Sequence, residues 1–216
     1  MSGANPRAVP VPKPPRASLW VWAIEGVLWR LARRGLKLYP YIAVQEGVQP
    51  VTLPAVAATM RAGWATESDL DALTALWSAR DGNARERLAK RFRAGKRCFA
   101  LCEGQNVLAA TWCDVESISH EPERRSLAEH EVYLFDAFVD PAARGRNLAP
   151  HVRYACYEAC RALGRTTMLS YTDYFNESSH RFKAKLGSRW LRVCLQVTLF
   201  RRWSHTFTLR RYRYGA

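Results

Sequence analysis

The chain has 216 residues, a formal net charge of +14 and six cysteines. At about 150 residues per domain, this length predicts one sizeable domain with an appendage. Hydrophobic residues make up 48% of the chain and charged residues 24%, which excludes a wholly disordered, collagen-like or coiled-coil protein. No apolar run reaches the roughly 18 residues that a membrane-spanning helix needs, and no signal-peptide cleavage pattern occurs. These features predict a cytoplasmic protein.

The first 58 residues are predicted to lie outside the main domain. Residues 1–17 contain five prolines and predict a disordered arm, because proline removes the hydrogen bonds of helix and sheet. In residues 18–58, an amphipathic helix with a basic C-terminal end is followed by a linker. Such an aromatic and basic helix suits an anionic membrane surface or an acidic carrier protein. Packing on its own domain or on the partner of a homodimer is the alternative.

From residue 60 onward, strand and helix patterns alternate. Strands are predicted at 60–65, 97–103, 107–115, 131–139, 167–172, 190–200 and 206–212. Helices are predicted at 67–79, 84–94, 148–163 and 176–186. The polar stretch before residue 131 is expected to be a solvent-exposed loop, and it carries His120. This order predicts a single mixed α/β domain over residues 59–216.

The positive charge is concentrated at the two ends of the chain. Residues 1–40 carry seven Lys or Arg and one acid, and residues 181–216 carry ten and none, whereas residues 41–180 carry 16 basic and 18 acidic residues. The C-terminal segment interleaves arginines with aromatic residues, as single-stranded nucleic-acid binders do, but the near-neutral middle makes a nucleic-acid partner the weaker hypothesis. The cysteines lack metal-ligand spacing, so they are interpreted as free thiols and no metal is expected.

One segment predicts a binding site for an anion. A strand ends at Val139, a short loop follows, and a helix begins at Leu148. Such a turn gathers backbone N–H groups at the positive end of the helix, and Arg144 and Arg146 add positive charge. Neither the glycine pattern of dinucleotide-binding proteins nor that of the P-loop is present.

At these residues the sequence resembles the GCN5-related N-acetyltransferase (GNAT) superfamily. The family's cofactor motif, [QR]-x-x-G-x-[GA], is matched at Arg144 and Ala149, with Asn147 in place of the central glycine. Asparagine tolerates the positive φ that this glycine adopts. The motif of the following helix is matched at residues Asn176, Ser179, Phe182 and Gly187. The resemblance covers residues 60–200.

The resemblance implies a mostly antiparallel mixed sheet in which strands 131–139 and 167–172 splay apart and hold an acyl-coenzyme A, acetyl-CoA in the first place. It implies cofactor contacts at these positions: Phe138, Val139, Arg144, Gly145, Arg146, Asn147, Leu148, Ala149, Asn176 and Phe182. For Asn176, a simple helix N-cap is an equally good interpretation.

The resemblance also implies N-acylation of an amine, which needs a base for the amine and an acid for the leaving thiolate. The base candidates are Tyr133, Glu131 and Asp136. For the acid, Tyr174 and Tyr171 are candidates, because the family's usual tyrosine is replaced by Lys183, which is interpreted as a surface or phosphate-binding residue. The acceptor is expected to be a small amine, an amino sugar or a protein amine. A module that binds acyl-CoA without catalysis is the alternative.

Overall fold

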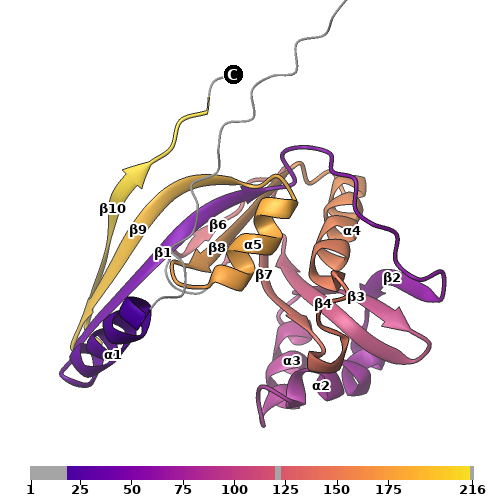
Figure 1. Cartoon of the computed structure of the whole chain (residues 1–216), viewed down its shortest axis with the longest axis horizontal. Coiled ribbons are helices and arrows are strands. Elements are labelled where there is room, and N and C mark those ends of the chain that lie inside the picture. The colour runs from indigo at the N-terminus through magenta and orange to yellow at the C-terminus, as the bar shows by residue number, and fades with distance from the viewer. Residues whose placement is uncertain (1–18, 120–122, 215–216) are drawn as a thin grey trace, which may run out of the picture.

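The computed structural model describes residues 19–119 and 123–214, with side chains described from residue 23 onward. The proline-rich arm and His120 lie outside these residues. The described chain forms one eight-stranded sheet in the order β10-β9-β1-β8-β7-β4-β3-β2 (Figure 1). All neighbouring strands pair antiparallel except β7 and β8, which are parallel. The strands are β1 (Leu36–Glu46), β2 (Met60–Ala65), β3 (Arg97–Glu103), β4 (Asn106–Asp114), β7 (Glu131–Val139), β8 (Thr167–Asp173), β9 (Arg189–Leu199) and β10 (Trp203–Arg211).

Helices cover both faces of the sheet. They are α1 (Leu19–Arg33), α2 (Leu70–Ser78), α3 (Ala84–Arg93), α4 (Leu148–Ala162) and α5 (Glu177–Lys185). Successive side chains of a strand point to opposite faces, and β3 shows this directly. Phe99 and Leu101 pack in the core that includes α4, whereas Cys98 and Ala100 pack in the core that includes α2 and α3. The predicted α/β class with a mixed sheet is confirmed.

The N-terminal part of the sheet differs from the prediction. Residues 36–46 form β1, which lies between β9 and β8, whereas residues 42–58 were expected to be a linker. Its centre, residues 41–44, is buried on both faces and therefore reads as a continuous apolar run without the alternation that marks a half-buried strand. The boundary predicted at residue 59 is wrong, because β1 is a central strand of the same sheet. The stretch before β7, expected to be a loop, also holds a short hairpin of β5 (Ser117–Ile118) and β6 (Arg125–Ser126).

Strands β7 and β8 separate along their length. Three residue pairs join them, from Glu131–Thr167 to Tyr133–Leu169, and no ladder pair follows between the described residues 134–139 and 170–173. On its other side β7 stays paired with β4, but a bulge interrupts that ladder beside Asp136, whose φ is 45°. The bulge bends β7 and increases its local twist. The result is the splayed pair of strands that the sequence predicts.

The end of the sheet formed by α1, β9 and β10 is unusually apolar on its surface. Among the side chains that the structure describes, nine large hydrophobic ones are exposed, and eight of these lie in α1 or in the β9–β10 hairpin: Ile24, Val27, Trp29, Leu199, Phe200, Trp203, Phe207 and Leu209. Phe200 lies against Gly35, the residue that ends the turn after α1, and donates its N–H to the Gly35 carbonyl at 2.6 Å. Helix α1 lies beside this end of the β9–β10 hairpin (Figure 1). Among the described residues, no helix is long and apolar enough to cross a bilayer.

Candidate functional site

A cavity of about 670 Å³ opens where β7 and β8 part. Its walls come from β7, β8 and α5, with Tyr39 of β1 and a group of charged residues from the α2–α3 region. Of the predicted site residues, the lining includes Tyr133, Asp136, Asn176 and Phe182. The splay therefore produces a solvent-accessible site at the centre of the sheet, of the size that ligand-binding clefts have.

The loop between β7 and α4 has the conformation of an anion cradle. Gly145 has a φ of 82°, and Asn147, in the left-handed region at φ 62° and ψ 24°, is the N-cap residue of α4. A Cβ added to Gly145 would meet no atom within 4 Å, so the space above the loop is open. Asn147 adopts the positive φ that the glycine of this motif would adopt, and its side-chain oxygen accepts a hydrogen bond from Lys185 at 2.8 Å. The Asn147 side chain makes no cap hydrogen bond to α4, so it leaves the first N–H groups of the helix for another acceptor.

The predicted cofactor residues near the loop differ in which of their atoms can reach a ligand. Arg144, Gly145 and Arg146 are exposed in the loop, where side chains and backbone can both reach a ligand. Leu148 is only 2% exposed and packs in the core beneath the loop, so it can contribute only its backbone N–H. Phe138 and Val139 lie on the splayed part of β7, and their side chains pack against the two cores.

Asn176 serves as the N-cap of α5. Its side-chain oxygen accepts a hydrogen bond from the Ser179 backbone N–H at 3.1 Å, which satisfies one of the first N–H groups of the helix. The same residue lines the cavity. The capping interpretation thus holds, and Asn176 also lies where a ligand in the cavity would pass.

A fully buried ionic network forms the wall of the cavity beside α4 and α5. Glu46, at the end of β1, accepts hydrogen bonds from Arg153 at 2.8 and 2.9 Å and from the Tyr157 hydroxyl at 2.5 Å. The Nζ atom of Lys183 lies 3.2 Å from Oε1 of Glu46. Burial raises the pKa of the Glu46 carboxyl, but the two cations outweigh it and hold that pKa well below its usual range.

Lys183 belongs to this network and not to the surface. It is 5% exposed, and its ammonium also donates to Ser170 at 2.7 Å and to Thr172. Burial lowers its pKa to about 8. The interpretation of Lys183 as a surface residue is wrong. An ammonium has three donors, and Glu46, Ser170 and Thr172 accept all of them, which makes Lys183 a structural cation of the cavity wall.

The opposite wall carries arginines. Asp136, at the bulge of β7, accepts hydrogen bonds from Arg80 at 2.9 Å, Arg87 at 3.0 Å and Arg91 at 2.6 Å. Burial raises the pKa of Asp136, but the positive charges of Arg91, Arg80 and Arg87 outweigh burial, so the pKa is lowered overall. The carboxylate is thus held ionised by three cations.

The sequence model of the Acetyltransferase (GNAT) family matches residues 64–187, which is more than half of the chain. The chain belongs to the GNAT acetyltransferase family. The match begins in β2 and ends just after α5, so it takes in the cavity and the loop before α4 but not β1, β9 or β10. No curated protein matches the sequence.

Solved structures share the GNAT fold at low sequence identity. A GNAT acetyltransferase from Colwellia psychrerythraea has a TM-score of 0.57 and 16% identity, covering 79% of this chain and 60% of its own. A putative GNAT acetyltransferase from Novosphingobium aromaticivorans has a TM-score of 0.53 and 18% identity, covering 76% of this chain and 66% of its own. The glucosamine N-acetyltransferase region of a fungal multi-domain β-N-acetylglucosaminidase has a TM-score of 0.56 and 14% identity, covering 85% of this chain and 23% of its own. The chain therefore spans less than two thirds of the length of these relatives.

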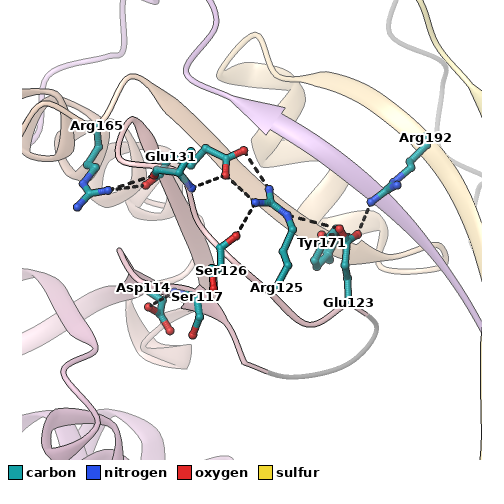
Figure 2. Close-up of polar contacts among 10 residues, drawn as sticks. Asp114, Ser117, Glu123, Arg125, Ser126, Glu131, Arg165, Tyr171 and Arg192 are labelled. Atoms are coloured by element: carbon teal, nitrogen blue, oxygen red, sulfur yellow. Dashed lines mark hydrogen bonds and ion pairs between the residues drawn. The ribbon is translucent and has the colours of Figure 1, made fainter.

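Two of the five candidate catalytic residues in this GNAT domain, Glu131 and Tyr174, lie outside the cavity lining. The Glu131 carboxylate accepts hydrogen bonds from Arg125 at 2.6 and 3.0 Å (Figure 2). It also accepts the Ala128 N–H at 2.9 Å. The hydrogen bonds from Arg125 lower its pKa, which makes it a weaker base. Tyr174 packs instead beside Ile42 and Trp190.

Tyr133 lies in the cavity but has the wrong protonation state for a base. It is 3% exposed, stacks on Phe135 at 5.6 Å between ring centroids and lies 5.5 Å from the ring of Tyr171. Burial raises its pKa, so the phenol keeps its proton at neutral pH. Tyr133 can therefore donate a hydrogen bond or a proton. Tyr171, also in the lining, donates its own hydroxyl proton to Glu123 at 2.8 Å (Figure 2).

Asp173 is a candidate that sequence reasoning missed. It ends β8 at the mouth of the cavity, where its carboxylate accepts the Phe175 N–H at 2.8 Å. Burial raises its pKa, and no cation is paired with it in the described part of the chain. A carboxylate whose pKa is raised is a stronger base than an ordinary aspartate, which makes Asp173 a candidate proton acceptor. No sequence signal singled it out, because its position depends on where β8 ends relative to β7.

Proposed function

We propose that this chain is an acyl-CoA-dependent N-acyltransferase that acylates a primary amine by direct attack. The observation that carries the proposal is the splay of β7 and β8 beside a loop with two positive-φ residues at the start of α4. Together these features offer a slot for an extended arm and a cradle for its phosphates. Family membership supports the same reaction class.

The residues present fit an acyl-CoA. The open space above Gly145 admits a pyrophosphate to the backbone N–H groups of residues 144–149, while Arg144 and Arg146 supply charge. Residues 136–139 of β7, which no ladder joins to the described part of β8, supply backbone groups for the pantetheine arm and for the acyl carbonyl. Phe182 and Asn176 border the same slot from α5. When bound, acyl-CoA supplies an activated thioester.

We assign the proton transfers to Asp173 and Tyr133. Asp173 accepts the proton of the attacking amine, and Tyr133, which keeps its proton, donates toward the leaving sulfur. Asp173→Asn is expected to lower kcat by about 10²–10⁴-fold while acetyl-CoA still binds. Because the pKa of Asp173 is raised, the activity of the wild type should increase with pH through a pKa above that of an ordinary aspartate, and Asp173→Asn should abolish that step.

Mass spectrometry of the purified protein, followed by calorimetry with acetyl-CoA and an amine panel, tests the proposal. Copurified acyl-CoA or one calorimetric site, together with amine-dependent thioester loss, would support it. Binding without thioester loss would favour a non-catalytic module. If turnover occurs with acyl-carrier-protein thioesters but not with acyl-CoA, the acyl donor is an acyl carrier protein and not acyl-CoA. No binding of any acyl thioester would overturn the proposal.

We propose that the chain also associates with an anionic membrane surface through α1 and the β9–β10 hairpin. Eight exposed apolar side chains gather there, and Glu25 of α1 is also exposed. The other exposed charges around them are basic, from Arg30, Arg33, Arg34, Lys37, Arg201, Arg202, Arg210 and Arg211. Aromatic and aliphatic side chains beside cations suit the headgroup region of an anionic bilayer.

Flotation of the full chain with phosphatidylserine-containing vesicles tests this association. A truncation at residue 40 would cut β1, so the better variant is Trp29→Ser with Trp203→Ser, which leaves every charge in place. Loss of flotation in the double variant, with retention in the control Leu163→Ser, is expected. Equal flotation of the wild type, the double variant and Leu163→Ser would contradict the proposed membrane association. So would binding of the full chain to nucleic acid or to a second copy of itself with no flotation on vesicles.

A further inference from the structure

Three arginines from the α2–α3 region face the cavity beside Asp136. Arg87 also binds Asp81 at 2.6 Å through its Nε atom, so it bridges two carboxylates. Arg80, Arg87 and Arg91 all line the cavity together with Asp81 and Asp136. This side of the cavity therefore holds three positive and two negative groups.

The three arginines differ in how firmly they are held. The guanidinium of Arg91 lies 5.1 Å from the ring centroids of both Trp112 and Phe135, and its side chain is 17% exposed. Arg87 and Arg80 are more open, with side chains 32% and 57% exposed. Arg91 thus anchors the group, whereas Arg80 and Arg87 present guanidinium edges to the solvent of the cavity.

The arrangement leaves binding capacity unused. Each guanidinium has more N–H donors than the one or two that these carboxylates engage. Guanidinium groups fit carboxylates and phosphates through paired hydrogen bonds. A wall with surplus positive charge and surplus donors is complementary to an anion, and it repels a polycationic acceptor.

We infer that the acceptor of this enzyme carries an anionic group, a carboxylate or a phosphate, which binds to Arg80 and Arg87 while its amine reaches the thioester. This inference rests on the proposed N-acyltransferase function. The arginines therefore select the acceptor.

Matched amine pairs test the inference by activity. Glycine is compared with glycinamide, phosphoethanolamine with ethanolamine, and glucosamine 6-phosphate with glucosamine, all with acetyl-CoA. At least one anionic member should exceed its neutral partner by about tenfold or more in kcat/KM, and the pair that does so separates carboxylate from phosphate. Arg80→Gln and Arg87→Gln should reduce this preference by about tenfold or more, mainly through KM. Arg85→Gln is the matched control, because Arg85 lies on α3 but pairs with the exposed Asp71 outside the cavity.

Binding provides a readout that does not depend on turnover. Protein saturated with coenzyme A is titrated calorimetrically with phosphoethanolamine, with ethanolamine and with glycine. The inference predicts that an anionic amine binds with similar affinity to the wild type and to Arg85→Gln. Its affinity should be lower for Arg80→Gln and Arg87→Gln. If coenzyme A itself does not bind, the proposed function fails. If coenzyme A binds but no anionic amine is preferred in either assay, or if Arg80→Gln, Arg87→Gln and Arg85→Gln behave alike, the inference alone is overturned.

Discussion

The two charged walls of the cavity are built from the same residue types but differ in burial. In the wall beside α4 and α5, Glu46 and Arg153 are at most 2% exposed, and every donor of Lys183 has an acceptor. In the wall beside α2 and α3, Asp136 gathers three arginines, of which two are open to the cavity. The first wall is satisfied by its own chain, whereas the second retains donors for another molecule.

This difference shows how charge in one cavity serves two purposes. A fully paired buried network excludes alternatives and fixes the position of the elements that carry it, here β1, α4 and α5. A partly exposed cluster with excess charge contributes less to stability and more to recognition. The predictions below test this division, from the largest expected effect to the smallest.

Removing Glu46 should produce the largest loss of stability. Glu46→Ala leaves Arg153 and Lys183 as buried cations without their common counter-ion, so the free energy of unfolding should fall by about 3–5 kcal/mol. Urea denaturation measures it. The control is Asp71→Ala, which breaks the exposed pair with Arg85 and should change stability little. Equal effects of the two substitutions would mean that the buried wall is no more structural than the surface.

The same wall should make stability depend on acid pH. Because the folded-state pKa of Glu46 lies below its unfolded value, its contribution is present above the unfolded pKa of about 4.5 and is lost as the pH falls toward the folded pKa. The free energy of unfolding, measured in urea between pH 7 and 3, should therefore fall more steeply for the wild type than for Glu46→Gln. Parallel pH profiles would rule out a strongly stabilised Glu46 carboxylate.

The loop that leads from β7 into α4 should show an intermediate effect. Asn147 has positive φ, which a β-branched residue tolerates poorly, so Asn147→Val should cost roughly 1–2 kcal/mol of unfolding free energy. Asn147→Gly should keep stability and acetyl-CoA affinity close to the wild type. Calorimetric binding and urea denaturation of both variants provide the check. If Asn147→Val changed neither the free energy of unfolding nor the affinity for acetyl-CoA, the positive φ of Asn147 would matter for neither stability nor cofactor binding.

The smallest change in stability is expected in the open wall. Arg80→Gln removes one of three cations from Asp136, and the remaining two hold that carboxylate ionised. Its urea unfolding curve should be close to the wild type, while its selectivity between anionic and neutral amines falls. A large loss of stability in Arg80→Gln would show that both walls are structural.

Local patterns predicted the strands at 60–65, 97–103 and 131–139, whose bounds agree with the structure, and the loop before α4. They failed at β1, because a strand buried on both faces between β9 and β8 lacks alternation. The role of Glu46 was also missed, because its partner Arg153 lies 107 residues away in the sequence. The arginine wall was also missed, because Asp136 meets Arg80, Arg87 and Arg91 only after β7 bulges toward α3. Contacts across such separations follow from sheet order, which no local pattern encodes.

The central claim is that β7, β8 and the loop before α4 form an acyl-CoA site. Amide hydrogen exchange of the full chain with and without acetyl-CoA tests it most directly. The account predicts slowed exchange at residues 144–149 and along the splayed part of β7 at 134–139, with β2 unchanged. No protection anywhere, or protection confined to segments outside the β7–α4 region and the cavity wall, would contradict it.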